Sequence, residues 1–274
     1  SMAFLNEVDG VLIPNPGYPT YASVTELVGA RAVPYTLSTT NDWLPNLAAL
    51  EKLDLSGVKL MWINYPHMPT GAKATLDIFK ELIAFATKHD ILIINDNPYA
   101  HILSDTPLSL LAVEGADKVA LEFQSLSKAY NMAGWRVGMV CGNADLITQV
   151  LKVKSNMDSG MFFGIQQGAM AALNQLSDWF AQINDVYQKR REWVWKIADA
   201  LNTTYQKDTA GMFVWAKLPE GAADSETYID ALLHEHGIFI APGTIFGMAG
   251  EGYIRFSLCV SEERIKEALN RITL

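Results

Sequence analysis

The feature that most constrains the fold is a series of short apolar runs separated by segments with helical spacing. The runs GVLIP, KLMWIN, ILIIND and KVALEFQS begin at residues 10, 59, 91 and 118, and VGMVCG follows at 137–142. Strands that are apolar along their whole length are typical of sheets covered by helices on both faces. The sequence therefore predicts an α/β fold with a mostly parallel sheet flanked by helices.

Helical patterns occupy one connection between these runs and much of the second half of the chain. Residues 74–90 predict a helix, and residues 160–175 predict another. Residues 178–204 predict one long amphipathic helix that joins two domains. Its candidates for burial are Trp179, Ile183, Val186, Trp193, Trp195 and Ile197.

The C-terminal residues alternate strand and helix patterns. The expected elements are a strand at 210–219, a helix at 224–237, strands at 238–243 and 252–259, and a helix at 261–272. We therefore expect a large domain at 1–187 and a smaller C-terminal α+β domain at 188–274.

Composition limits the partners and the location. The 274 residues carry a formal net charge of −9, which argues against nucleic acid as a partner. No apolar run reaches the length of a membrane span, and the first ten residues lack the charged region of a signal peptide, so a membrane partner is not expected. Cys141 and Cys259 both lie in apolar runs, which favours reduced thiols in the core. We expect a cytoplasmic protein.

Polar residues follow three of the apolar runs. Asp96 ends one run, Asn64 ends another, and Ser125 to Lys128 follow a third. Open α/β sheets bind ligands at the carboxyl ends of their strands. A carboxylate there needs a partner because desolvation alone is costly, Lys128 can condense with a carbonyl, and Arg136 with the serine hydroxyls can hold a phosphate. One ligand that meets these needs is pyridoxal 5′-phosphate (PLP), with its aldehyde, phosphate and basic ring nitrogen.

The stretch SLSKAYNMAGWRVG at 125–138 resembles the cofactor-lysine motif of the class I/II, fold-type I aminotransferases. It has the pattern S-x-S-K and an arginine eight residues after the lysine. The resemblance implies the PLP-transferase fold type I and a Schiff base between Lys128 and PLP. It also implies a phosphate site made by Ser125, Ser127 and Arg136.

Further motifs extend the resemblance over nearly the whole chain. DNPY resembles the family segment that places Asp96 on the pyridine nitrogen and Tyr99 on the phenolic oxygen of PLP. NPGYPTY resembles the segment whose aromatic residue, here Tyr18, stacks on the cofactor ring. In GYIRFSLC, Arg255 matches the arginine that binds the substrate α-carboxylate. Asn64, the first residue of NYPHMPTG, is a further candidate for cofactor binding.

Two departures from the family pattern change these expectations. Where the family has N-P-x-N-P-T-G, this chain has Met68 at the asparagine that contacts the phenolic oxygen. A thioether is a weak acceptor and donates nothing, so we expect the lysine-bound cofactor to titrate at a higher pH than in a Met68→Asn variant. In other members about a hundred residues precede the matched segment, including a Gly-rich turn at a helix N-terminus that cradles the phosphate. We therefore expect a fragment or shortened chain with weakened PLP affinity.

The resemblance implies a PLP-dependent aminotransferase that moves an amino group from an L-amino acid to a 2-oxo acid. Lys128 is then both the anchor and the acid/base at Cα, and Asp96 keeps the ring nitrogen protonated. The resemblance also implies a homodimer. Two alternatives stay open, a PLP-dependent β-lyase or synthase on the same fold and a catalytically impaired fragment. Product analysis separates transfer from elimination, because elimination releases ammonia.

Structural readings of the same residues also stay open. Lys128 can be a solvated surface charge, Asp96 a turn residue before Pro98, and Arg255 half of an internal salt bridge. Tyr18 and Tyr99 can be ordinary packed aromatics. His234 and His236 in HEHG lack further ligands nearby, so no metal site is expected. The substrate is not fixed by the sequence, although Met68, Met161, Phe162 and Phe163 favour a neutral or aromatic side chain.

Overall fold

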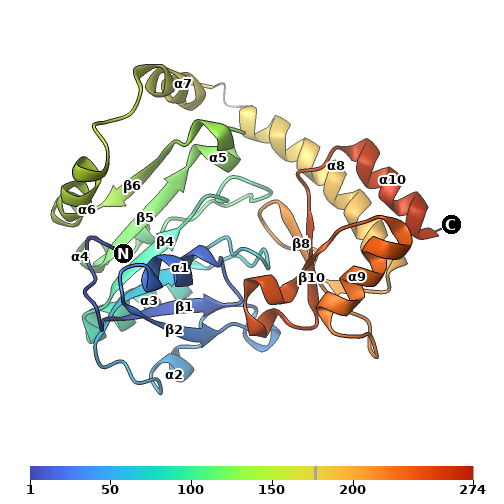
Figure 1. Cartoon of the computed structure of the whole chain (residues 1–274). Coiled ribbons are helices and arrows are strands. Elements are labelled where there is room, and N and C mark those ends of the chain that lie inside the picture. The colour runs from blue at the N-terminus through green and yellow to red at the C-terminus, as the bar shows by residue number, and fades with distance from the viewer. Residues whose placement is uncertain (176–177, 274) are drawn as a thin grey trace.

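The larger part of the molecule is built on a six-stranded sheet. The computed structural model describes residues 1–175 and 178–273 (Figure 1). The strand order is β2-β1-β3-β4-β5-β6, the first five strands are parallel, and β6 is antiparallel to β5. The predicted mostly parallel sheet is thus confirmed. Its strands are β1 (Gly10–Asn15), β2 (Arg31–Thr36), β3 (Val58–Ile63), β4 (Leu92–Asp96), β5 (Ala120–Ser125) and β6 (Gly138–Gly142).

Helices cover both faces of this sheet. On one face α3 (Leu76–His89) packs its apolar stripe against the strands. On the other face lie α1 (Thr20–Glu26) and α6 (Ala144–Met157), whose apolar side chains meet the opposite side chains of the same strands. The Thr75 side chain caps α3 by accepting from the Ile78 amide, which fixes where the helix begins.

A second, antiparallel sheet of order β7-β8-β10-β9 forms the smaller part of the molecule. One continuous hydrophobic core reaches from α3 and the parallel sheet to the side chains of this second sheet. The smaller α+β unit is therefore packed firmly on the larger one. Its elements are β7 (Thr204–Tyr205), β8 (Phe213–Lys217), α9 (Ser225–His236), β9 (Ala241–Pro242), β10 (Tyr253–Ser257) and α10 (Glu262–Thr273).

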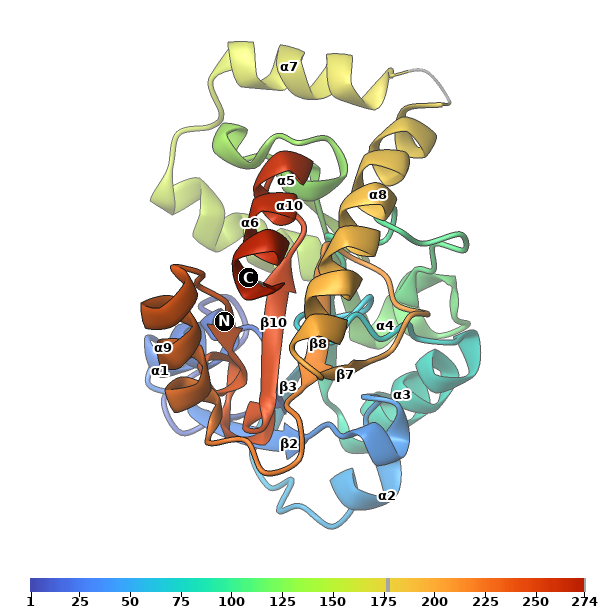
Figure 2. The same ribbon diagram turned by 90° about the vertical axis from the view of Figure 1, so that its right-hand side faces the viewer.

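The long helix α8 (Trp179–Ala200) runs from the top of the large sheet down to the second sheet (Figure 2). The helix continues without a break across residues 187 and 188, where we expect the large domain to end and the small one to begin. We propose that the two domains divide at this point inside α8. The expectation that Val186 is buried is wrong, since 44% of it is exposed. Ile183 and Tyr187 form the buried ridge at this level of the helix, and Val186 lies at its edge.

Short elements complete the chain. The helix α7 (Phe163–Leu173) lies at the top of Figure 1 and has no fully buried side chain. Its Ile165, Ala169 and Ala172 pack against a small cluster of Leu126, Met132 and Val137. Within the described residues, no helix combines the length and the apolar character needed to cross a membrane. The remaining helices are α2 (Leu47–Leu50), α4 (Ala116–Val119) and α5 (Leu126–Ala129), with 3-10 turns at Thr39–Asn41, Leu110–Ala112, Ala133–Trp135, Gly243–Phe246 and Met248–Gly250.

Candidate active site

The site begins where two neighbouring strands end. Asp96 is the last residue of β4, and Ser125 is the last residue of the adjacent parallel strand β5. The Ser125 side chain accepts from the Ser127 amide at 3.1 Å and so starts α5, the short turn that carries Lys128. Asp96 and Lys128 are therefore brought to the same edge of the sheet.

A buried tyrosine holds the carboxylate of Asp96. Tyr21 donates its phenolic hydrogen to Asp96 Oδ2 at 2.8 Å, and its ring stacks on Trp62 with centroids 5.0 Å apart. Burial raises the pKa of Asp96, and the hydrogen bond from Tyr21 opposes this rise. Sequence reasoning missed Tyr21. The signal was its place in NPGYPTY, three residues after Tyr18.

Asn64 uses both ends of its amide on the backbone of the same region. Its Nδ2 donates to the carbonyl of Asp96, and its Oδ1 accepts from the Met68 amide at 2.8 Å. Asn64 thus ties the end of β3 to the end of β4. This arrangement orients neighbouring residues, and both polar atoms of the side chain already have protein partners.

Tyr99 is close enough to both Asp96 and Arg255 for their charges to act on it. Burial, followed by the charge of Asp96, raises the pKa of Tyr99, and the charge of Arg255 opposes this rise. The Arg255 guanidinium lies over the rings of Phe213 and Phe246, 4.0 and 4.5 Å from their centroids. Burial lowers the pKa of Arg255. Among the described residues its Nε is buried without a hydrogen-bond partner. Such a cation is ready for an anionic ligand.

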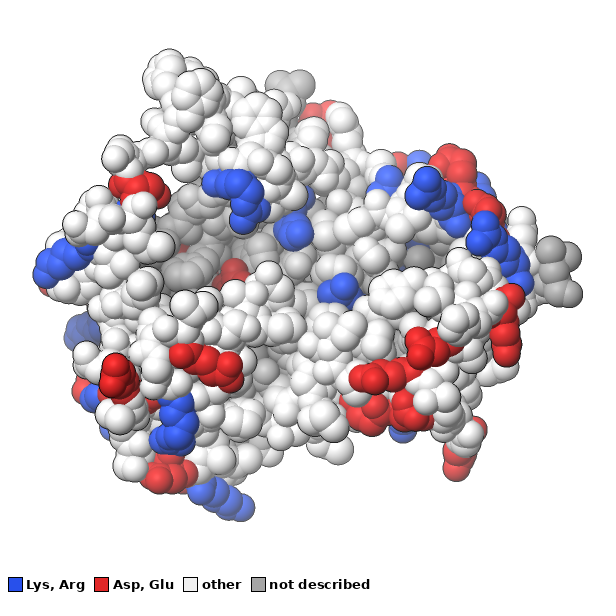
Figure 3. All heavy atoms as spheres, in the orientation of Figure 1, with Lys and Arg blue, Asp and Glu red and all other residues white. Residues whose placement is uncertain are grey.

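Lys128 faces a pocket between α5 and α8. Lys128, Ser127, Met212 and Cys259 all line this pocket of about 540 Å³. Met212 directly precedes Phe213, whose ring lies against the Arg255 guanidinium, so this pocket adjoins the group around Arg255. Figure 3 shows a hollow in this face of the molecule, with basic side chains along its border.

The side chains of Arg136 and Tyr18 are more exposed to solvent than those of Asp96, Tyr99 and Arg255. Arg136 is exposed and donates from Nη1 to the carbonyl of Ala133 at 2.8 Å, with a left-handed backbone (φ 55°). Tyr18 is 46% exposed and meets the Tyr21 ring edge-on at 5.7 Å. Both side chains are accessible to a ligand near Asp96 and Lys128.

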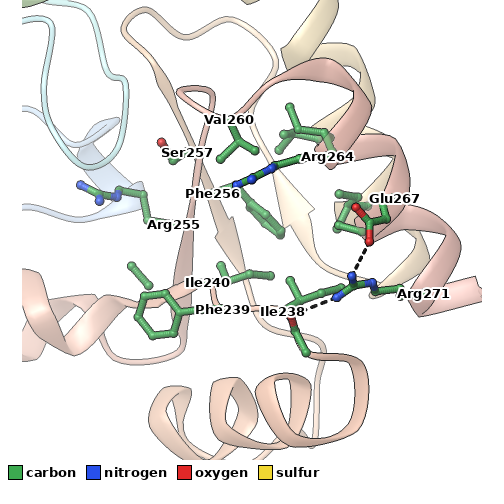
Figure 4. Close-up of a pocket in the computed structure, with 16 residues that line it drawn as sticks. Ile238, Phe239, Ile240, Arg255, Phe256, Ser257, Val260, Arg264, Glu267 and Arg271 are labelled. Carbon is green, nitrogen blue, oxygen red and sulfur yellow. Dashed lines mark hydrogen bonds and ion pairs between the residues drawn. The ribbon is translucent and has the colours of Figure 1, made fainter.

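A larger cavity of about 620 Å³ lies between α8, α10 and the strands β9 and β10, and Arg255 is among the residues that line it. Its walls are mostly apolar, and Arg271 at its border is already paired with Glu267. In Figure 4 the side chain of Arg255 points away from the apolar residues of this cavity. The candidate active site is therefore the sheet edge where β4 and β5 end, and the smaller pocket lies on its Lys128 side. Of the residues that the sequence predicts, Lys128 and Ser127 line this pocket, whereas Asp96, Tyr99, Arg136 and Arg255 do not.

Comparison with known proteins agrees with this geometry. The profile of the family "Aminotransferase class I and II" matches residues 1–272. The chain belongs to that family. Aminotransferases of this family use PLP, and this enzyme transfers an amino group from an amino acid to a 2-oxo acid. The β-lyase alternative receives no support from these comparisons.

Several relatives are aminotransferases by name. The LL-diaminopimelate aminotransferase of Dehalococcoides mccartyi strain 195 is 42% identical over 98% of this chain and 70% of its own length. The structure of BacF from Bacillus subtilis superposes with a TM-score of 0.92 at 34% identity, over 98% of this chain and 69% of BacF. An aminotransferase from Staphylococcus aureus gives 0.91 at 34% identity, over 99% of this chain and 72% of its own. The expected PLP fold type I is confirmed.

The residues of this aminotransferase fit PLP. Among the described residues, no protein group of opposite charge is paired with the side chains of Asp96, Lys128 or Arg136. A ring nitrogen, an aldehyde and a phosphate would supply one partner to each of them. The sequence prediction named all three, whereas Tyr21 and the contact between Arg255 and Met68 emerge only from the structure.

Proposed function

We propose that Lys128, Asp96 and Arg255 carry the aminotransferase reaction. The observation that supports this most is that the half-buried carboxylate at the end of β4 and the lysine just after β5 share one edge of the sheet, while Met68 and Asn64 link Arg255 to the backbone of Asp96. None of these three charged groups has an ion-pair partner in the described residues. When bound, PLP supplies an aldehyde that condenses with amines and a ring that accepts electrons from the substrate Cα.

The residues take separate tasks in this proposal. Lys128 Nζ holds the cofactor in the resting enzyme, and as a free amine it removes the Cα proton and later returns a proton. Asp96 keeps a proton on the ring nitrogen, and Tyr21 fixes the Asp96 carboxylate for this task. Arg255 binds the substrate carboxylate through two parallel hydrogen bonds.

The remaining predicted residues hold the cofactor in place. We propose that Ser125, Ser127 and Arg136 bind the phosphate, that Tyr99 donates to the phenolic oxygen, and that Tyr18 covers the ring. Asn64 acts through the backbone of Asp96 and Met68. The Tyr99 hydroxyl stays protonated at neutral pH, since its pKa is raised, and this suits a donor.

Replacing Asp96 tests the assignment of roles. Asp96→Ala should keep the visible absorbance of lysine-bound PLP but slow the half-reaction with any amino acid by about a hundredfold or more, since the ring nitrogen loses its partner. Stopped-flow absorbance measures both quantities on one sample. Asp230→Ala, which removes an exposed carboxylate on α9, is the control. A near-native rate in Asp96→Ala would remove Asp96 from the mechanism.

The substrate is an L-amino acid whose carboxylate meets Arg255 in this proposal. The named relatives make LL-diaminopimelate the first compound to test. Structural neighbours include an aromatic aminotransferase from Pyrococcus horikoshii, so phenylalanine is the second. Met68 contacts Arg255, whereas Phe162 and Phe163 are mostly exposed, so the lining beside Arg255 favours an apolar side chain only weakly. A half-reaction screen followed by absorbance separates these candidates.

We also propose a homodimer. The chain presents a series of exposed apolar side chains on α6, on α7 and on the loop between them, and a globular surface rarely leaves such a strip in water. The residues concerned are Leu151, Met157, Met161, Phe162, Phe163, Met170 and Leu173. Cys141 is half-buried and Cys259 is exposed, so the expectation that both lie in the core is wrong. Their free thiols fit the reducing cytoplasm, which we propose as the location.

A further inference from the structure

The side chain of Arg255 has an unusual resting partner. Among the described residues, the hydrogen-bond acceptor for its guanidinium is the thioether of Met68, with Sδ 3.4 Å from Nη1. The other contacts of the guanidinium are the faces of Phe213 and Phe246. Its Nε is buried with no partner in the described part of the chain. Aromatic faces and a sulfur atom stabilise a cation much less than a carboxylate does.

Met68 is held in this position by its backbone. Its amide donates to Asn64 Oδ1 at 2.8 Å, and Asn64 in turn donates to the carbonyl of Asp96. Only 6% of Met68 is exposed. The backbone of Met68 is therefore fixed by the same contacts that tie the end of β3 to the end of β4, and its side chain extends from there to Arg255.

The atom that lies beside Nη1 of Arg255 determines how readily the guanidinium can donate to a ligand carboxylate. An oxygen acceptor at this position would occupy the N–H group strongly and compete with an incoming carboxylate. A sulfur acceptor competes weakly. We propose that Met68 covers this part of the guanidinium with an apolar, weakly accepting group and so keeps Arg255 available for the ligand carboxylate. This inference rests on the proposed role of Arg255.

The proposal predicts that a stronger hydrogen-bond acceptor at residue 68 makes the protein bind a carboxylate ligand more weakly. Met68→Glu places a carboxylate beside Arg255 and should weaken binding about tenfold or more. Met68→Gln places a neutral oxygen there and should weaken binding a few-fold. Met68→Leu keeps the volume without an acceptor, and the carboxylate should bind at least as tightly as to the native protein.

Calorimetric titration of the PLP-loaded protein with 3-phenylpropionate, a carboxylate that cannot react, measures this order. Met248→Glu is the matched control because Met248 is an exposed methionine on the 3-10 turn Met248–Gly250. The proposal is overturned if Met68→Glu binds as the native protein does. It is also overturned if Met68→Leu loses as much affinity as Met68→Gln, because packing would then explain the losses.

Arg255→Ala separates this inference from the function on which it rests. If Arg255→Ala loses binding and the order at residue 68 is found, both stand. If Arg255→Ala loses binding while Met68→Glu does not, only the inference about Met68 fails. If Arg255→Ala binds 3-phenylpropionate normally, the role of Arg255 fails, and the inference fails with it. Visible absorbance confirms in each variant that PLP is bound.

Discussion

Asp96 is the carboxylate of the site, and its ionisation depends on its surroundings. Its carboxyl group is largely removed from water at the end of β4, and one phenol hydrogen bond from Tyr21 offsets part of the cost. A cationic ring nitrogen would remove the rest of that cost. The unliganded protein should therefore be less stable where Asp96 is ionised, and binding of PLP should reverse this.

The pH dependence of unfolding checks this prediction. Burial raises the pKa of Asp96 above its ordinary value of 3.8, so the folded protein binds the proton more tightly than the unfolded chain does. Asp96 therefore contributes stability that is present below pH 3.8 and is lost as the pH rises through the folded pKa. Relative to the native protein, Asp96→Asn should therefore become progressively more stable as the pH rises through this range. Urea unfolding of the two PLP-free proteins from pH 4 upward measures the difference in their free energies of unfolding. A stability advantage of Asp96→Asn that becomes smaller as the pH rises would contradict the prediction.

Single residues divide clearly into those that the sequence could indicate and those that it could not. Asp96 ends an apolar run, Lys128 follows another and Arg255 lies inside a third, and charge at such positions needs an explanation. Tyr21 looks like an ordinary packed aromatic in the sequence, because its hydrogen bond joins residues 75 positions apart. The contact between Met68 and Arg255 is hidden for the same reason, since it joins the two sheets.

At the scale of elements, Glu122 connects the strands that carry the site. This buried glutamate on β5 accepts from the side chains of Asn95 and Gln124 and from the Leu110 amide, at 3.0, 3.1 and 2.8 Å. Asn95 also accepts from the Tyr65 amide through Oδ1. One carboxylate thus joins β5, the residue before Asp96 and the segment that follows β4.

Removing this carboxylate should loosen all three elements. Glu122→Ala leaves three donors unpaired and should lower the free energy of unfolding by about 3 kcal/mol or more, while Glu122→Gln keeps one oxygen acceptor and should cost less. Urea unfolding at neutral pH measures both changes. Glu114→Ala removes an exposed glutamate from the same region and is the control. Equal losses in Glu122→Ala and Glu114→Ala would show that Glu122 is not a structural tie.

Elements were predictable where their pattern was strong. The helix predicted at 74–90 is found at Leu76–His89, and the predicted long helix is α8. The strand β2 was missed because RAVPYT contains a proline and lies at the edge of the sheet, where burial is partial. The helix α6 was missed as well, because none of its side chains is fully buried and its apolar stripe is narrow.

For the whole molecule, the open question is what covers α7. Phe163 on this helix and Phe239 in the smaller unit are each 67% exposed. In a homodimer that buries α7, Phe163→Glu should shift the protein from dimer to monomer, because a charge would be buried in an apolar interface. Phe239→Glu, an equal change at equal exposure, should leave the dimer intact. Light scattering after size-exclusion chromatography measures the mass, and a native protein that is monomeric at all concentrations would end this proposal.

The central claim is that Lys128 carries PLP at the edge of the sheet beside Asp96. Borohydride reduction of the PLP-loaded native protein, followed by peptide mass spectrometry, tests it most directly. We predict that the peptide containing Lys128 gains the mass of a reduced pyridoxyl phosphate, and that Lys128→Ala shows neither this adduct nor the visible absorbance. An adduct on any other lysine of the native protein, or unchanged absorbance in Lys128→Ala, would contradict the claim.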